Sequence, residues 1–231
     1  MKKTVLGLVL LSLSSQAFAQ FEAGDTAYSA SYFMGMEGSG EQKSCKDLEV
    51  EVKIEKNIPK WVRNQALKDL SVYLKPADIQ EYPPEAELFK VCEGWLTTKR
   101  SLMAEVLYHV PGERMSIVFY LDEKNCCDSK KTMKRAYTYN VNLADNSFYD
   151  LATYYQKHKR AIDAEVMSKV RRRYSENWSR KYINMISLED KAPVGFDDRG
   201  FLVFSVSTIK DKEHVPWIVA YDRLPAALPW K

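Results

Sequence analysis

The residues with the clearest potential for chemistry are four cysteines, two of which are adjacent. Cys126 and Cys127 lie in the stretch NCCDS, and the other two are Cys45 and Cys92. Such thiols can serve redox chemistry, metal binding or disulfide bonding. Zinc sites and thioredoxin-like centres favour a C-x-x-C spacing, which this sequence lacks. The cysteines therefore favour structural disulfides.

The even number of cysteines predicts two disulfides if the chain reaches an oxidising compartment. A bond between Cys126 and Cys127 would distort the peptide between them, which strongly prefers planar trans geometry. We therefore expect each of them to bond to one of Cys45 and Cys92. Both such pairings remain open.

The first 19 residues have the features of a secretory signal peptide. Lys2 and Lys3 precede a short apolar run at residues 4–14, and Ala-Phe-Ala at 17–19 is a small-x-small cleavage site. The run is too short for a stable membrane-spanning helix, which needs about 20 residues. We expect cleavage near Ala19 and a mature protein that is periplasmic or secreted by a bacterium.

The overall composition is that of a globular protein with nearly balanced charge. The 231 residues include 34 Lys and Arg and 31 Asp and Glu, so nothing in the charge requires a nucleic-acid partner. Aromatic residues make up 12% of the chain, which suits both sheet cores and binding surfaces.

The three histidines, His109, His158 and His214, are isolated in sequence. The best functional candidate is His214, which we expect in a loop where Asp211 and Glu213 lie close enough in sequence to raise its basicity. The sequence contains neither the G-x-S-x-G of serine hydrolases nor the H-E-x-x-H of zinc proteases. We expect no metal and no cofactor.

Basic side chains gather near the end of a predicted long helix and just after it. Such a run is typical of a solvated helix face, but it could also bind an anionic partner, such as a protein, a wall polymer or lipopolysaccharide. The candidate anion-binding or partner-binding residues are Lys169, Arg171, Arg172, Arg173, Arg180 and Lys181.

The elements that must position these residues follow from hydrophobic periodicity. Alternation at 48–55 predicts a strand, and helical spacing predicts amphipathic helices at 58–76 and 148–178. A further helix carrying Cys92 is expected within 82–95. Strand-like runs occupy 102–110, 113–123, 134–143, 196–209 and 215–224, with a turn at 111–113.

This order of elements predicts an α+β fold. We expect a mostly antiparallel sheet with two main amphipathic helices, stapled by two disulfides. The expected organisation is a signal peptide at 1–19, a loosely ordered arm at 20–47, and a single domain at 48–231.

Three stretches resemble a known family of bacterial extracytoplasmic domains. MSIVFYLDEKNCCDSKKTMKRAYTYNVNLADNSFYDLATYY and the terminal GFDDRGFLVFSV and WIVAYDRLPAAL are similar to a domain of unknown function. That domain occurs in lysozyme-sensing anti-sigma factors and beside some peptidoglycan deacetylases. The resemblance spans about residues 48–228, and it implies a non-catalytic binding domain that faces the cell wall.

We therefore expect an exported, non-catalytic binding protein of the bacterial cell envelope. It would bind or block a protein partner, as an immunity protein or a lysozyme inhibitor does, or bind a wall polymer. The alternative is a cell-envelope hydrolase whose active site is assembled only by the fold.

Overall fold

The computed structural model describes most of the chain after residue 26. The described residues are 27–37, 43–75, 80, 92–125, 128–173, 186–189, 192–207, 213–224, 226, 228 and 230. The expected signal peptide lies outside them.

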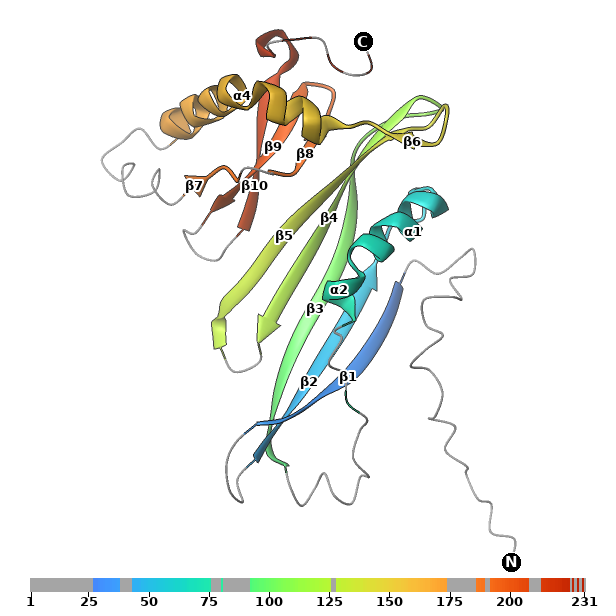
Figure 1. Ribbon diagram of the computed structural model, residues 1–231, viewed down its shortest axis with the longest axis vertical. Coiled ribbons are helices and arrows are strands. Elements are labelled where there is room, and N and C mark those ends of the chain that lie inside the picture. The colour runs from blue at the N-terminus through green and yellow to red at the C-terminus, as the bar shows by residue number, and fades with distance from the viewer. Residues whose placement is uncertain are drawn as a thin grey trace, which may run out of the picture.

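A long six-stranded sheet forms the body of the molecule, and its strands follow the order of the chain (Figure 1). These strands are β1 (Ala27–Glu37), β2 (Lys43–Lys53), β3 (Cys92–Val110), β4 (Arg114–Asn125), β5 (Asp128–Asn142) and β6 (Ser147–Phe148). The region expected to be a loosely ordered arm thus contains the 11-residue edge strand β1. The predicted strands at 48–55, 102–110, 113–123 and 134–143 overlap β2, β3, β4 and β5, respectively.

The sheet is mixed, so the prediction of a mostly antiparallel sheet is wrong. Strands β2 and β3 pair in parallel, whereas the other pairs are antiparallel. The reason lies in their connection, which contains α1 (Lys60–Asp69) and α2 (Ser71–Leu74). A helical crossover brings the chain back to the same end of the sheet, so the next strand runs in the same direction.

The prediction of two main helices is also incomplete, because the predicted helix at 58–76 divides into α1 and α2. Leu70 lies between them with φ −94° and ψ 2°. Together with the long helix α4 at Leu151–Arg173, the described residues therefore contain three α-helices. The prediction that Cys92 lies in a helix is wrong. Cys92 is the first residue of β3 and pairs with Lys43 of β2. Residues 81–91 lie outside the description.

The helices α1 and α2 cover one face of the large sheet. Apolar residues alternate along β2, β3 and β4, so every second side chain points toward the helices. Each fully buried aliphatic side chain of this kind contributes about 1.5–3 kcal/mol. Buried members of this core include Val50, Leu102, Ile117, Val62 and Leu70.

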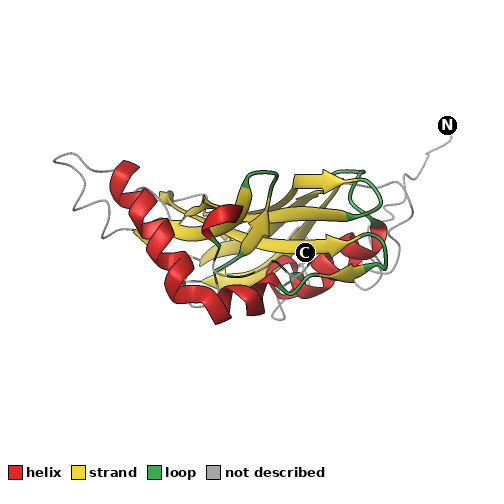
Figure 2. Ribbon diagram, turned by 90° about the horizontal axis from the view of Figure 1, so that it is seen from above, coloured by secondary structure: helices red, strands yellow, loops and turns green. Residues whose placement is uncertain are grey.

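A smaller sheet and a long helix form the other half of the molecule. They comprise α4 (Leu151–Arg173), β7 (Ile186–Ser187), β8 (Val194–Phe196), β9 (Gly200–Ser207) and β10 (Glu213–Ala220), followed by a 3-10 turn at Tyr221–Arg223. One face of this sheet packs on the uncovered face of the large sheet, through Phe204 against Val118. The other face packs on α4, which lies outside the strands in Figure 2.

Strand β8 is joined to the large sheet by buried polar side chains. Ser116 donates its hydroxyl hydrogen to Asn140 Oδ1 at 2.8 Å and accepts the Phe196 N–H at 3.1 Å. Asn140 Nδ2 donates to the Val194 carbonyl at 2.8 Å. No backbone ladder links these two sheets in the described residues, so these side chains fix how β8 sits on the large sheet.

The prediction of a fold stapled by two disulfides falls mostly on residues outside the description, and no bridge joins two of the described side chains. Cys45 is fully buried in β2 and is disulfide-bonded. It is the only cysteine whose side chain is described. The side chain of Cys92 and all of Cys126 and Cys127 lie outside the description. In the described structure the sheets are held together by packing and hydrogen bonds.

Candidate binding groove

A groove of about 580 Å³ lies at the junction of the two halves of the molecule. It is bounded by α1, by β5, by the connection from β6 to α4, and by the segment before β8. The lining residues are Gln65, Asp69, Ala136, Tyr137, Thr138, Tyr139, Asn140, Phe148, Tyr149, Asp150, Leu151, Ala152, Ala192, Pro193 and Val194. This volume is within the range typical of small-molecule sites.

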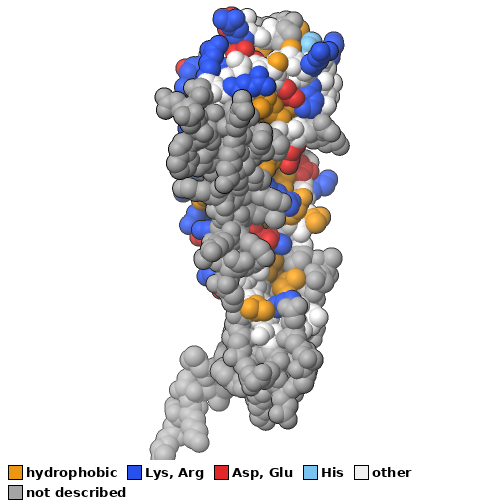
Figure 3. Space-filling model, turned by 90° about the vertical axis from the view of Figure 1, so that its left-hand side faces the viewer, with side chains coloured by type: hydrophobic (Ala, Val, Ile, Leu, Met, Phe, Trp, Pro, Cys, Tyr) orange, Lys and Arg blue, Asp and Glu red, His pale blue; other side chains and the backbone are white. Residues whose placement is uncertain are grey.

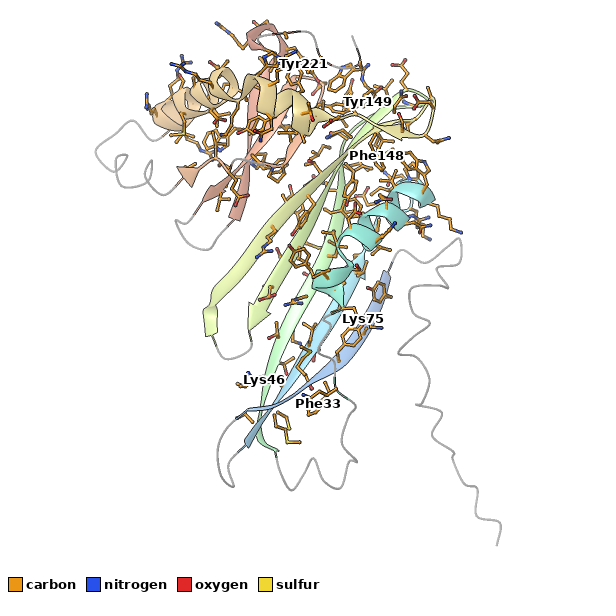
Figure 4. The ribbon with its side chains drawn as sticks, viewed as in Figure 1. Phe33, Lys46, Lys75, Phe148, Tyr149 and Tyr221 are labelled. Atoms are coloured by element: carbon orange, nitrogen blue, oxygen red, sulfur yellow. The ribbon has the colours of Figure 1, made fainter. Side chains whose placement is uncertain are left out.

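Aromatic rings from three elements meet at the groove. Phe148, on the short strand β6, remains 42% exposed although it is a large apolar side chain. Its ring centroid lies 4.9 Å from that of Trp61 in α1 and 5.8 Å from that of Tyr139 in β5. Figure 4 shows Phe148 and Tyr149 next to each other, close to the start of α4. Phe148 thus offers an apolar surface that is supported by neighbouring rings.

Asp69 supplies an oriented polar group beside these rings. The Tyr139 hydroxyl donates to Oδ2 at 3.0 Å, and Gln65 Nε2 donates to Oδ1 at 2.8 Å. Each carboxylate oxygen keeps a second lone pair, and the Gln65 amide keeps its carbonyl oxygen and one N–H. The pair therefore presents both acceptors and a donor toward the groove in a fixed orientation.

Tyr139 is held in its neutral, donating form. Burial raises the pKa of Tyr139 well above its usual value, and the hydrogen bond to Asp69 raises it further. Both effects oppose ionisation, because a phenolate is poorly solvated there and would face a carboxylate. The hydroxyl therefore continues to orient Asp69 at any physiological pH.

The groove has a negative rather than a positive character. Asp69 and Asp150 are among its lining residues, and no Lys, Arg or His occurs among the described residues that line it. The hydroxyl and the backbone N–H of Thr153 donate to Asp150 and hold the pKa of this carboxyl below its usual value. Asp150 is therefore an anion at neutral pH.

We expect Asp150→Ala to lower the free energy of unfolding by about 1 kcal/mol at pH 7, since Asp150 accepts the Thr153 N–H at the start of α4. A lowered folded-state pKa stabilises the protein above the unfolded pKa, and this contribution is lost as the pH falls through the folded value. The difference from wild type should thus shrink below about pH 4. Urea unfolding of both proteins at pH 7 and at pH 3 measures this difference in the free energy of unfolding.

Asp198→Ala is the control for this pH dependence. The Asp198 side chain is 71% exposed and lies 3.7 Å from the guanidinium of Arg199. We expect a change within about 0.5 kcal/mol at both pH values. An Asp150→Ala effect that is the same at pH 3 as at pH 7 would contradict the role of the charged carboxylate.

The four predicted basic residues that the structure describes do not line the groove. Lys169 donates to the Ile218 carbonyl at 2.6 Å, which ties α4 to β10. Arg171, Arg172 and Arg173 are exposed at the end of α4, and the Arg173 guanidinium lies 5.8 Å from the Trp217 ring centroid. In the face shown in Figure 3, Lys and Arg side chains are interspersed with acidic ones. Arg180 and Lys181 lie outside the described residues.

The candidate His214 lies in β10, opposite Val206 of β9, and its side chain is not among those described. The prediction that His214 lies in a loop is therefore wrong, because this residue is part of a strand.

Within the described part of the chain, no three His, Cys, Asp or Glu side chains are close enough to hold a metal ion. None of its helices is long and apolar enough to cross a membrane.

The sequence patterns do not predict the residues of the groove. One signal was present, because Tyr137 and Tyr139 alternate within YTYNVN and so share a face of their strand. What the sequence does not show is that α1, more than 60 residues earlier, places Gln65 and Asp69 beside that face. The groove residues come from segments that only the tertiary fold brings together.

Among the known proteins compared with this chain, only solved structures are similar to it, and the similarity is confined to the course of the backbone. No protein-family model matches the sequence. No curated protein matches it either. A DUF3298 family protein from Pseudomonas aeruginosa PAO1 is 13% identical, with a TM-score of 0.43, over 86% of this chain and 90% of that chain.

A member of the DUF3298 family from Bacteroides fragilis NCTC 9343 is 9% identical over 87% of this chain and 92% of that chain, again with a TM-score of 0.43. Both similar structures are thus DUF3298 family proteins. Sequence identities and TM-scores this low do not assign this chain to a family or to an activity. The resemblance to the domain of anti-sigma factors and deacetylases stays a prediction.

Proposed function

We propose that this chain is an exported binding protein of the bacterial cell envelope, and that the groove between α1, β5 and the start of α4 is its binding site. The observation that carries the proposal is the exposed ring of Phe148 beside the oriented carboxylate of Asp69. Ligand sites combine apolar and aromatic surface with a few fixed polar groups in this way. Export is supported by the signal-like residues 1–19.

Binding accounts for the two carboxylates of the groove better than hydrolysis does. A glycosidase needs a carboxylic acid with a raised pKa to protonate the leaving group. The pKa of Asp150 is instead lowered, and Asp69 accepts hydrogen bonds from Tyr139 and Gln65. Both carboxylates are engaged in orienting protein groups, which suits a recognition surface.

The test is retention of an envelope component by the immobilised mature chain, which begins at Gln20. We expect wild type to retain a component from an envelope extract of the source bacterium and Phe148→Ala to lose most of it, because truncation removes the exposed ring. Met103→Ala is the matched control, since Met103 is 44% exposed on β3 and does not line the groove. Equal retention by Phe148→Ala and wild type would overturn the assignment of the site.

Export is tested separately by cell fractionation and N-terminal sequencing. We expect the protein outside the cytoplasm, with a new N-terminus close to Gln20. A full-length chain confined to the cytoplasm would overturn this part of the proposal.

A further inference from the structure

We propose that the ligand of the groove is a neutral glycan chain, recognised by stacking of a sugar ring on Phe148 and by hydroxyl hydrogen bonds to Asp69 and Gln65. This inference rests on the proposed function, because it names the class of ligand for the same site. The following observations distinguish a glycan from an anion, a cation and an extended peptide.

The first observation is the position of the Phe148 ring. It is 42% exposed, whereas its neighbours Trp61 and Tyr139 support it at centroid distances of 4.9 and 5.8 Å. The negatively polarised face of an aromatic ring attracts the slightly positive C–H groups of an apolar sugar face. A ring held in place by two others loses little side-chain entropy when a sugar stacks on it.

The second observation is the polar pair next to that ring. Asp69 is oriented by one donor on each oxygen, from Tyr139 at 3.0 Å and from Gln65 at 2.8 Å. The free lone pairs of Asp69 accept hydrogen bonds from hydroxyl groups, and the remaining Gln65 N–H donates to them. A polyol satisfies acceptor and donor together, since each hydroxyl both donates and accepts.

Charge argues against phosphorylated or acidic ligands. Asp69 and Asp150 would repel an anion, and the described lining residues include no cation to compensate. A cationic ligand is disfavoured for a different reason. An ammonium group only donates, so it would leave the remaining Gln65 N–H without an acceptor, whereas a hydroxyl satisfies both Asp69 and Gln65.

The geometry of β5 argues against an extended peptide that would add a strand to the sheet. The Asn140 carbonyl already accepts the Tyr149 N–H at 2.7 Å, at the edge that such a peptide would use. The hydroxyl oxygen of Thr138 accepts the Val194 N–H at 3.1 Å, so the chain before β8 lies beside this part of the strand. Strand addition needs a row of open backbone groups.

The experiment is a titration of the mature protein with tetra-N-acetylchitotetraose, a neutral sugar chain, followed by tryptophan fluorescence and calorimetry. Trp61 packs against Phe148 and serves as a local reporter. We expect saturable binding, weakened about tenfold by Phe148→Ala, which removes the stacking surface. We expect a similar loss for Asp69→Asn, since a hydrogen bond to a charged acceptor is stronger than one to a neutral acceptor.

Matched controls are Met103→Ala and Asp198→Asn, whose side chains are exposed away from the groove. Both should bind the sugar as wild type does. An acidic glycan and a Lys-rich peptide serve as competing probes, and unfolding curves show that each variant is folded. Sugar binding that is unchanged in Phe148→Ala and Asp69→Asn would overturn the inference.

The outcomes separate this inference from the proposed function. If neutral sugars do not bind, but the envelope component is still captured by wild type and lost in Phe148→Ala, then the ligand is not a glycan and the binding role stands. Tighter binding of the Lys-rich peptide or of the acidic glycan leads to the same conclusion. If the groove variants alter neither sugar binding nor capture, both proposals fail.

Discussion

Gly200→Ala is expected to lower the free energy of unfolding by about 3 kcal/mol, the upper part of the usual range for overpacking. Gly200 is the first residue of β9 and pairs with Ala220 of β10. A Cβ atom there would lie 2.3 Å from the Val219 carbonyl oxygen and 2.9 Å from Ile218 Cγ2. Since the first contact is with backbone, the two strands must move apart to make room.

Urea unfolding followed by tryptophan fluorescence measures this loss, with Gly112→Ala as the matched control. Gly112 occupies the turn between β3 and β4 with φ +73°, and an added Cβ would meet no atom within 4 Å. Its substitution should cost about 1 kcal/mol, because only the left-handed backbone is disfavoured. A Gly200→Ala cost no larger than the Gly112→Ala cost would contradict the close approach of β9 and β10.

Asn140→Ala is expected to destabilise the protein by about 3 kcal/mol, because it combines a cavity with unsatisfied polar groups. Asn140 is 5% exposed, and its side chain accepts from Ser116 and donates to the Val194 carbonyl. Both partners are themselves buried, so neither regains a hydrogen bond from water. The substitution therefore weakens the contact between β8 and the large sheet.

A double-mutant cycle with Ser116→Ala tests whether these residues act together. Ser116→Ala alone should cost about 2 kcal/mol, since it leaves the Phe196 N–H without its acceptor. The double variant should lose less than the sum, because each single variant already breaks the shared hydrogen bond. The control Asn142→Ala removes an exposed bond to the Ala144 N–H and should cost no more than about 1 kcal/mol. Additive losses would show that the residues act independently.

Local patterns predicted several elements of this chain well. The alternation of Leu48, Val50 and Val52 against charged residues places them in β2 with their side chains buried, as expected. The spacing of Ile162, Val166 and Val170 predicts α4, and all three are buried. These predictions succeed because periodicity reports directly which side of an element must avoid water.

The pairing of the elements was harder to predict. The sequence pattern of β2 and β3 is compatible with either strand direction, and the parallel pair arises because α1 and α2 lie in the crossover between them. The expected helix at Cys92 failed for a related reason, because a parallel ladder with β2 outweighs the local pattern. Long-range partners decide both outcomes, and no local window of sequence contains them.

The sequence by itself determined strands β2, β4, β5, β9 and β10, the two amphipathic helical segments and the turn at 111–113, because burial of apolar side chains imposes a local period. Only the tertiary structure decided the mixed sheet, the junction of the two sheets through Ser116 and Asn140, and the groove. The groove depends on Phe148 meeting Trp61 and on Tyr139 meeting Asp69, a pair 70 residues apart. Such contacts follow from how the layers pack, and packing depends on the whole chain at once.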